Sequence, residues 1–584
     1  MEYSPVEGTS RGRQIGVIGV VALSFAIFAA LTVRCFAGSA EESQPRSVNA
    51  NSISLPPMGW SSWNSFSNTV DSDVVVQQTQ ALVSSGMKKA GYSYINIDEG
   101  WWMGKRGQQG NIVVDSKQWP ALDPGEHAGD MSNIVRYIHR AGLKAGIYTD
   151  AGEAGCSFYG PDLGPPVPHT GSEGHYDQDF LLFAKWGFDY VKVDWCGGNN
   201  EKLDPAVQYA EIASAISRAE KITGHRLYYS ICNWGAKSPW TWAPGIGGVR
   251  ADIWRTSGDI VAPIVAGTPN STRQASFTGV LSNFDQGIHN EAQHTGYFND
   301  PDMMVIGMPG LSETQNRVHM MLWAISGAPL IVGADLSKLD STTKAILTNE
   351  RVIALDQDPL GLQAIKVAEP SSGLQIWVKP LAGVGDRAVL LLNRTSTEAT
   401  IEASWKEIGL DPQSAGIVQD LWTGKELGSS TSSYAVSVPA GDAVLLKIKG
   451  KEVRSTQYLA SASANRLHDG DAPEHCATCR DGQGAAIGGR NSVLFVVAPL
   501  KGVAVVRVSY ANPGGLPLIV QLKVDGNTPT NILLPPTNKK DKFGSVIWEV
   551  ESIQAGPSSS LSFSWADAPD AILKSISVQT FDEQ

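Results

Sequence analysis

The feature that most constrains the fold is a repeated alternation of short apolar segments with helix-like stretches. The helix-like stretches span residues 73–90, 132–141, 177–185 and 205–223, the last with apolar residues three and four positions apart. The apolar segments end in polar residues and span 58–63, 94–101, 143–152, 188–196, 227–235, 253–260, 297–303 and 329–335. This spacing favours βα units and a parallel sheet, and eight strands over about 290 residues favour a (β/α)8 TIM barrel over an open sheet.

The segment 188–196, FDYVKVDWC, describes a buried strand that carries a carboxylate near its end. Strand alternation places Lys192 and Asp194 on the same side. A neighbouring ammonium lowers the pKa of a carboxyl group and opposes the rise that burial causes, so Asp194 is predicted to be an ionised nucleophile. The alternative is a structural salt bridge that caps a core strand.

In a barrel the carboxyl ends of all strands meet at one mouth, and several predicted strands end in acidic, basic or aromatic residues. Indole rings stack on the apolar faces of sugars, and charged side chains bind sugar hydroxyls, so the sequence predicts a sugar pocket. The residues predicted to line it are Trp60, Asp98, Glu99, Asp150, Lys192, Asp194, Trp234, Arg255, Asp259 and Asp302.

Cleavage of a glycosidic bond needs two carboxyl groups, one to attack the anomeric carbon and one to protonate the leaving oxygen. Asp194 is predicted to be the nucleophile, and Asp259, which follows Ser257 and Gly258, the acid. A guanidinium in contact with Asp259 would lower the pKa of that acid. We therefore expect Arg255 to point at the sugar instead.

Two other uses of clustered acids are not supported by the motifs. Zinc-dependent barrel hydrolases need closely spaced histidines, and no His-x-His or His-x-x-x-His pair lies at a predicted strand end. No Gly-x-Gly-x-x-Gly or Walker-type loop follows a strand. The sequence therefore predicts neither a catalytic metal nor a nucleotide cofactor.

Seven motifs in one order resemble the retaining α-galactosidases, the melibiase-type glycoside hydrolases. They are PPMGWSSWNSF, YINIDEGWW, GIYTDAG, YVKVDWC, CNWG, RTSGDI and NDPDM, and the resemblance covers residues 55–449. It implies hydrolysis of terminal α-galactosides by double displacement, with Asp194 as nucleophile and Asp259 as acid/base. The implied substrates are galactosides in oligosaccharides or polysaccharides.

The resemblance also implies the remaining residues of the site. Cys156 and Cys196 match the family's disulfide, which suits an oxidising compartment. Cys232 is then a free thiol near the sugar or, alternatively, a small core residue. The galactosyl pocket would be formed by Trp60, Asp98, Tyr148, Lys192, Trp234, Arg255 and Asp302.

One departure from the family pattern affects the expected substrate. Where α-galactosidases usually carry two aspartates around C4 and C6 of the sugar, this chain has Asp98 followed by Glu99. The extra methylene of Glu99 would push its carboxylate into the space of the C6 hydroxymethyl, which β-L-arabinopyranose lacks. We therefore expect hydrolysis of β-L-arabinopyranosides besides α-galactosides, unless a repositioned loop absorbs the longer side chain. A difference of one carbon between two substrates in a pocket changes their relative transition-state binding by about 1 to 3 kcal/mol.

A second departure leaves two further alternatives open. Asn233 and Ala236 occupy the turn that faces C2, where α-galactosidases often have Glu and a larger residue. Smaller residues there accompany N-acetylgalactosamine specificity in relatives, so an α-N-acetylgalactosaminidase is one alternative. A catalytically inactive carbohydrate-binding protein is the other, and the joint presence of Lys192, Asp194 and Asp259 argues against it.

Charge and the N-terminal segment set the expected location. The formal net charge of −12 argues against nucleic acid or anionic membrane as partners. Residues 15–33 are an apolar run preceded by Arg11 and Arg13, so residues 1–40 are predicted to be a signal peptide or a single membrane anchor, followed by a linker at 41–54. Either prediction places the catalytic part outside the cytoplasm, as a secreted, periplasmic or membrane-anchored protein.

The predicted domains after the linker are a catalytic barrel at 55–345, an antiparallel β-sandwich at 350–450 and a second β-sandwich at 452–584. Predicted strands of the first sandwich are 374–381, 388–393, 400–405, 416–422 and 433–449, and of the second 492–498, 503–510 and 516–524. The second resembles galactose-binding-like modules that carry carbohydrate-binding sites and, in some cases, a structural calcium. The alternative is a scaffold without a ligand.

Two smaller motifs complete the inventory. Cys476 and Cys479 could form a local disulfide or half of a zinc site, and an exported chain favours the disulfide. Asn270 and Asn393 are glycosylation sequons that matter only in a host that glycosylates.

Overall fold

The computed structural model describes residues 55–452, apart from 160–166, 244–250, 261–273, 290–291, 294–297, 360 and 384, and beyond 452 mainly the strands between 456 and 580. The N-terminal segment 1–40, the linker 41–54, Asn270, Cys476 and Cys479 lie outside the described residues. Among the residues that are described, no helix is long and apolar enough to cross a bilayer.

The predicted parallel barrel is confirmed. Its strands are shorter than the apolar segments from which they were predicted. The strands are β1 (Met58–Ser61), β2 (Tyr94–Asn96), β3 (Lys144–Asp150), β4 (Tyr190–Asp194), β5 (Tyr228–Cys232), β6 (Ile253–Arg255), β7 (Phe298–Asp300) and β8 (Leu330–Val332). Sequential strands pair in parallel, and β1 also pairs with β8. Met304, just beyond β7, forms a parallel bridge to Val332 of β8, so the ring closes.

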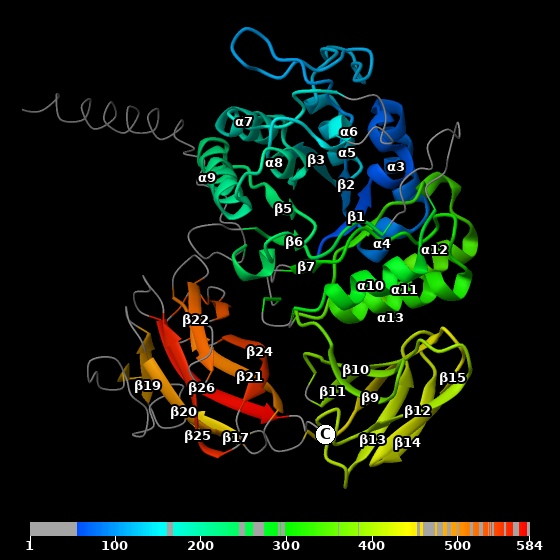
Figure 1. The fold of residues 1–584 in the computed structure, drawn as a ribbon, viewed down its shortest axis with the longest axis vertical. Helices are drawn as coiled ribbons and strands as arrows, with labels where there is room; N and C mark the ends of the chain where they lie inside the picture. Colours follow the sequence, from blue (N-terminus) through cyan, green and yellow to red (C-terminus); the bar gives the residue numbers. More distant parts are fainter. Residues whose placement is uncertain are drawn as a thin grey trace, which may run out of the picture. The chain divides into compact units, whose positions relative to one another are not determined.

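Helices surround this ring (Figure 1). The predicted helix 205–223 matches α9 in both bounds: Asp204 accepts hydrogen bonds from the amides of Ala206 and Val207, and Pro205 fixes the first turn. The predicted helix 73–90 is divided in two, because Gly86 has a φ of 90°. The helices of the barrel and its flank are α2 (Trp63–Phe66), α3 (Ser72–Ser84), α4 (Met87–Ala90), α5 (Ser132–Arg140), α6 (Cys156–Tyr159), α7 (Tyr176–Trp186), α8 (Cys196–Asn200), α9 (Pro205–Thr223), α10 (Phe277–Gln286), α11 (Glu313–Ser326), α12 (Ser341–Leu347) and α13 (Glu350–Asp356).

The sandwich after the barrel has one six-stranded and one two-stranded sheet, both antiparallel. Its strands are β9 (Ile365–Ser371), β10 (Leu374–Pro380), β11 (Asp386–Asn393), β12 (Ala399–Ser404), β13 (Ala415–Asp420), β14 (Glu426–Thr431), β15 (Ser433–Val438) and β16 (Ala443–Lys449). In β11, Val389 and Leu391 face the sandwich core, whereas Leu390 and Leu392 belong to the barrel's apolar cluster. Both faces of β11 are thus buried, which explains its unbroken apolar run.

The sequon at Asn393 lies at the end of β11 and is buried. Its side-chain amide donates hydrogen bonds to the carbonyl oxygens of Thr397 and Val438. Glycosylation of Asn393 in the folded chain would therefore remove at least one of these bonds, because it replaces one of the two amide hydrogens.

The C-terminal residues form two further antiparallel sheets. One contains β17 (Thr456–Leu459), β18 (Glu474–His475), β19 (Gln483–Ile487), β21 (Gly502–Ala511), β24 (Gly544–Ile553) and β26 (Ala571–Thr580). The other contains β20 (Ser492–Ala498), β22 (Leu518–Val524), β23 (Thr530–Leu534) and β25 (Gly556–Ser564). The predicted strands 492–498, 503–510 and 516–524 correspond to β20, β21 and β22.

Candidate active site

Strand register brings the central candidates to one level of the barrel. Asp150, Asp194 and Cys232, the last residues of β3, β4 and β5, are partners across the sheet. Two residues earlier on the same strands, Tyr148 pairs with Lys192. Parallel pairing in register explains why residues about forty positions apart meet at one height.

Lys192 joins two of the predicted carboxylates. Its Nζ lies 2.9 Å from Oδ2 of Asp98 and 3.5 Å from Oδ2 of Asp194. It also lies over the ring of Tyr148, 5.2 Å from the ring centre. The closest partner of the ammonium is therefore Asp98, and Asp194 shares it.

The pKa of Asp194 is raised, contrary to the expectation that Lys192 would hold it down. Burial raises it, and Lys192 is the largest opposing influence, while Asp98 and Asp259 add to the rise. Asp194 is only 4% exposed, so the loss of hydration outweighs one shared ammonium.

Two serines position Asp98, and the sequence reasoning missed both. Ser61 Oγ donates to Oδ2 of Asp98 at 3.2 Å, and the amide of Asp98 donates to Ser62 Oγ at 2.9 Å. Both serines follow Trp60 at the end of β1. The two serines of the GWSSW motif could have been predicted to reach the site, because polar residues at the carboxyl end of a barrel strand face the mouth.

Arg255 joins the other two predicted carboxylates, and here the expectation that it avoids Asp259 is wrong. One guanidinium nitrogen, Nη2, lies 3.0 Å from Oδ1 of Asp259, and Nη1 lies 3.0 Å from Oδ1 of Asp302. Nη2 also donates to the carbonyl oxygen of Ser257. The i,i+4 separation and the small residues between them let the chain turn back, so the pair forms in the free protein.

Asp302 is held in a strained backbone conformation, with a φ of 117°. Its carboxylate accepts hydrogen bonds from the amides of Met303 and Ile260, and Trp323 Nε1 donates to its carbonyl oxygen. Oδ1 of Asp300, a residue that the sequence reasoning did not single out, accepts from the amide of Asp302. Burial raises the pKa of Asp302, and Arg255 opposes that rise.

Glu99 is buried against the loop that follows β3. Its two carboxylate oxygens accept hydrogen bonds from the amide of Ser157 at 3.1 Å, and Oε1 also accepts from Ser157 Oγ at 2.6 Å. A Cβ atom on Gly155 would lie 2.3 Å from Oε1, so only glycine leaves room for this carboxylate. Burial raises the pKa of Glu99 to about 7 despite the bonds from Ser157.

The remaining predicted residues are Trp60, Tyr148, Trp234 and Cys232, of which Cys232 lines the cavity described below. Trp60 has no exposed surface, and its Nε1 donates to the carbonyl oxygen of Ala334. Tyr148 donates its hydroxyl hydrogen to Cys156 Sγ. Trp234 is half-buried with a φ of 55°, and the free thiol of Cys232 is buried, 3.7 Å from Nη1 of Arg255.

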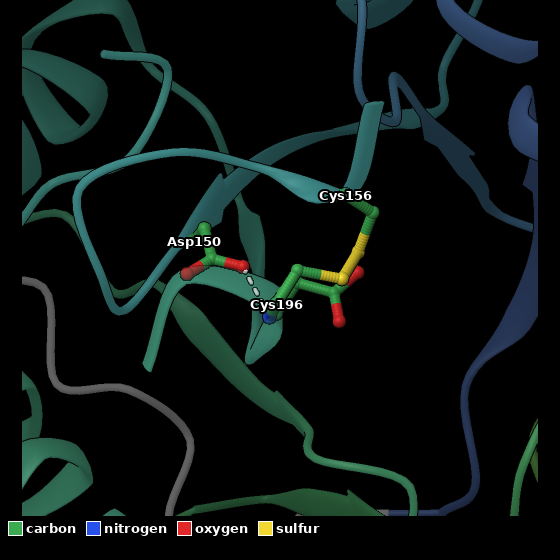
Figure 2. A group of neighbouring side chains, drawn as sticks. Asp150, Cys156 and Cys196 are labelled. Atoms are coloured by element: carbon green, nitrogen blue, oxygen red, sulfur yellow. Dashed lines mark hydrogen bonds between the residues drawn. A yellow bond between two sulfur atoms is a disulfide. The ribbon is translucent and has the colours of Figure 1, made fainter. Parts of the chain in front are cut away.

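The implied disulfide between Cys156 and Cys196 is present and ties α6 to α8 beside the strand end of Asp194. Asp150 does not line the pocket as predicted. Its carboxylate faces the backbone instead and accepts hydrogen bonds from the amides of Gly152, Cys196 and Gly197. Figure 2 shows the bond from Cys196. Asp150 thus fixes the turn that carries the disulfide.

One cavity joins the two charged groups. It is lined by Asp98 and Lys192 from the first group and by Arg255 and Asp302 from the second, whereas Asp194 and Asp259 are not among its lining residues. Its lining residues are Ser61, Asn96, Asp98, Tyr190, Lys192, Ser230, Cys232, Arg255, Asp300, Asp302, Met303 and Ile331. Carboxyl groups outnumber the two cations here, so a neutral ligand rich in hydroxyl donors suits the cavity.

Comparison with known proteins agrees with this geometry. The family described as alpha galactosidase A matches residues 55–358, and the alpha galactosidase C-terminal beta sandwich domain matches residues 371–448. A probable alpha-galactosidase of Dictyostelium discoideum is 39% identical over 394 residues, which is 66% of this chain and 91% of that protein.

Solved structures share the fold over the same region. Alpha-galactosidase I from Mortierella vinacea superposes with a TM-score of 0.60 at 30% identity, over 70% of this chain and all of that one. A β-L-arabinopyranosidase from Geobacillus stearothermophilus superposes with a TM-score of 0.56 at 22% identity, over 68% of this chain and 96% of that one, which establishes the shared fold alone. The chain belongs to the melibiase-type α-galactosidase family of glycoside hydrolases.

Proposed function

We propose that the protein is a retaining exo-glycosidase that removes terminal α-D-galactosyl residues, with Asp194 as nucleophile and Asp259 as acid/base. The observation that carries this proposal is the pairing of Lys192 with Asp98 and Asp194, and of Arg255 with Asp259 and Asp302, in a chain from this family. Asp98, Lys192, Arg255 and Asp302 line one cavity.

In the first step, Asp194 Oδ2 attacks the anomeric carbon and the bond to the leaving oxygen breaks. Lys192 and the amide of Trp195, which donates to Asp194 Oδ1 at 3.0 Å, keep the carboxylate oriented. Because burial raises the pKa of Asp194, its charge is poorly solvated in the free site. Bond formation to the sugar neutralises that charge, which favours the covalent intermediate.

The acid must give a proton to the leaving oxygen, and in the free protein Asp259 is paired with Arg255. Asp259 is 49% exposed, whereas Asp302 is 2% exposed, so the contact of Arg255 with Asp302 is the better shielded one. We propose that a bound glycoside displaces Arg255 from Asp259 while Arg255 keeps Asp302. Water then attacks the glycosyl–Asp194 ester, with Asp259 as base.

The pocket is proposed to accept β-L-arabinopyranosides as well, because Glu99 is held in place. Three hydrogen bonds from Ser157 and the close contact with Gly155 leave its carboxylate no room to withdraw into the loop. A fixed Glu99 would restrict the C6 side of the sugar, where arabinopyranose has no substituent.

An α-N-acetylgalactosaminidase is the second candidate function. The side-chain amide of Asn233 donates to the carbonyl oxygen of Ala236, so these two residues close the tight turn after β5. A small turn at this position would leave room for an acetamido group at C2. The larger body of support, from the relatives and the charged pairs, favours galactosides.

Two further proposals concern the location of the protein and its domain boundaries. The Cys156–Cys196 disulfide supports folding in an oxidising compartment, outside the cytoplasm. The domain boundaries 55–345, 350–450 and 452–584, a carbohydrate-binding role for the last unit and an N-terminal signal or anchor stay proposals.

The test is kcat/KM for p-nitrophenyl α-D-galactopyranoside, p-nitrophenyl β-L-arabinopyranoside and p-nitrophenyl N-acetyl-α-D-galactosaminide, measured side by side. Turnover of the first two, with the anomer first released identified by NMR as the retained one, supports the proposal. A clear preference for the third supports the second candidate. No turnover of any substrate by a folded protein contradicts the assignment as an enzyme.

A further inference from the structure

Asp300 has no part in the proposed chemistry, yet it lies beside the residues that carry it. It is the last residue of β7, it lines the cavity, and it is the direct partner of Arg255 in the parallel pairing of β6 with β7. Direct partners on parallel strands point to the same side of the sheet, so both side chains face the barrel interior. The carboxylate of Asp300 is thus a neighbour of the Arg255 guanidinium.

We propose that Asp300 is a positioning residue that keeps Arg255 on the side of Asp302 and so frees Asp259 to act as the acid. It does so in two ways, because it fixes the backbone of Asp302 and its charge attracts the guanidinium. This role rests on the proposed function, since it concerns the release of Asp259 for acid catalysis.

The first contribution is a hydrogen bond to strained backbone. The amide of Asp302 donates to Oδ1 of Asp300 at 2.9 Å, and Asp302 has a φ of 117°, which surrounding contacts must enforce in a residue other than glycine. The carbonyl oxygen of Pro301 accepts from Asn283 Nδ2 at 2.8 Å, so both polar groups of the peptide unit before Asp302 are held. This fixed backbone aims the Asp302 carboxylate at Nη1 of Arg255, 3.0 Å away.

The second contribution is electrostatic. Asp300 attracts the guanidinium of Arg255 from the barrel interior, whereas Asp259 attracts it from the solvent-exposed side. Arg255 and Lys192 oppose the rise in the pKa of Asp300 that burial causes, so the charge of Asp300 is supported from two sides. The titratable groups that face Arg255 are Asp259, Asp300, Asp302 and Cys232, and Asp194 in turn faces Asp259.

Loss of the Asp300 charge has two consequences of the same sign for the acid. Arg255 loses one interior counter-charge, so its pair with Asp259 becomes closer. Asp259 also loses a repelling neighbour, because the carboxylates of Asp300 and Asp259 disfavour each other's charge. Both changes lower the pKa of Asp259, and an acid with a lowered pKa is deprotonated over more of the pH range.

The experiment compares wild type, D300N and D300A of the full-length protein. D300N keeps an oxygen that can accept from the amide of Asp302 and removes the charge, whereas D300A removes both. D177N is the matched control, because Asp177 pairs with Arg218 and its side chain is 69% exposed.

Each protein is assayed from about pH 4 to pH 9 on two galactosides that differ in their need for an acid. The leaving group of p-nitrophenyl α-D-galactopyranoside needs little protonation, whereas that of methyl α-D-galactopyranoside must be protonated. Thermal unfolding of the same preparations shows whether each variant is folded.

We expect D300N to lower kcat/KM about tenfold for the methyl galactoside and less than about threefold for the nitrophenyl galactoside. The alkaline limb of its pH profile should move to lower pH, because the pKa of Asp259 falls. D300A should in addition raise KM, because Asp302 loses its backbone support. D177N should match wild type in every readout.

An equal loss on both substrates with an unchanged alkaline limb would overturn the proposal, because Asp300 would then contribute only to folding or to sugar binding. Unchanged kinetics of D300N would overturn the electrostatic contribution. If D300A does not fold, D300N alone decides, since it preserves the shape of the side chain. No turnover of either substrate by folded wild type would contradict the proposed function itself, whereas active wild type with an unaltered D300N contradicts the role of Asp300 alone.

Discussion

The two ends of the barrel strands differ in almost every physical respect, although they belong to the same strands. At the amino ends, the first residues of β2, β4, β5, β6 and β7 form an apolar floor: Tyr94, Tyr190, Tyr228, Ile253 and Phe298. Tyr190 and Tyr228 stack at 5.6 Å with an interplanar angle of 10°. The carboxyl ends form a mouth of buried, crowded carboxyl groups.

The difference shows which end of the barrel stabilises the folded state and which end carries buried groups that destabilise it. The floor buries aromatic rings without placing charges inside the cluster. In the mouth, burial raises the pKa values of Glu99, Asp150, Asp194, Asp300 and Asp302, and two non-glycine residues, Trp234 and Asp302, have positive φ. We therefore expect mouth substitutions to change activity more than stability, and floor substitutions to do the reverse.

The largest expected effect is that of Asp194→Asn. Loss of the nucleophile should lower kcat/KM for the galactoside by at least about 1,000-fold. The melting temperature should stay the same or rise, since the variant removes a buried charge whose pKa burial has raised. Steady-state kinetics and thermal unfolding of the same preparation measure both. A fall in melting temperature of several degrees would break the contrast between mouth and floor.

Next in size is Tyr228→Ala in the floor. Removing a fully packed aromatic ring should cost about 3 to 5 kcal/mol of unfolding free energy, measured by urea denaturation, with KM little changed. Tyr228→Phe is the matched control. The Tyr228 hydroxyl is buried and has no hydrogen-bond partner among the residues that the structure describes, so the phenylalanine variant should be as stable as wild type or more stable. A large loss in that control would mean that the hydroxyl has an essential partner.

Glu99→Asp tests specificity in the mouth. The shorter side chain should shift the ratio of kcat/KM values toward the galactoside by roughly 1 to 3 kcal/mol, since it frees space on the C6 side. Ser157→Ala is the companion variant: it removes one hydrogen bond to Glu99 and keeps its length. An unchanged substrate ratio in Glu99→Asp would contradict the size filter and indicate that the loop has adjusted.

Expressed per pH unit, the smallest expected effect is on the pH dependence of stability. The folded pKa of Glu99, about 7, lies above the ordinary glutamate pKa of 4.5, so the folded state binds more protons between these pH values. The contribution of Glu99 is therefore fully present at low pH and lost as pH rises through 7, with a slope of at most about 1.4 kcal/mol per pH unit. In Glu99→Gln this slope should be absent. Unfolding free energies from pH 4.5 to 8 would show whether the two proteins differ.

Much of the fold and part of the site were predictable from residue order. Alternation in FDYVKVDWC placed Lys192 and Asp194 on one side, and β4 confirms it. The alternation of eight apolar segments with helix-like stretches predicted eight parallel strands, because this spacing favours βα units. Strand bounds were overestimated, since the polar residues at each exit, such as Asp98 and Glu99, continue the chain direction without pairing in the sheet.

By itself, the sequence determined the barrel and the following sandwich, because hydrophobic periodicity and strand direction are local properties. It also placed Lys192 and Asp194 on one side of a strand. Only the tertiary structure decided how the residues of the site pair. Arg255 bonds Asp259 as well as Asp302, Asp150 turns to backbone amides, and Ser157 fixes Glu99. Ion pairs and buried pKa values depend on distances and burial between residues far apart in the chain, and neither quantity is contained in their spacing.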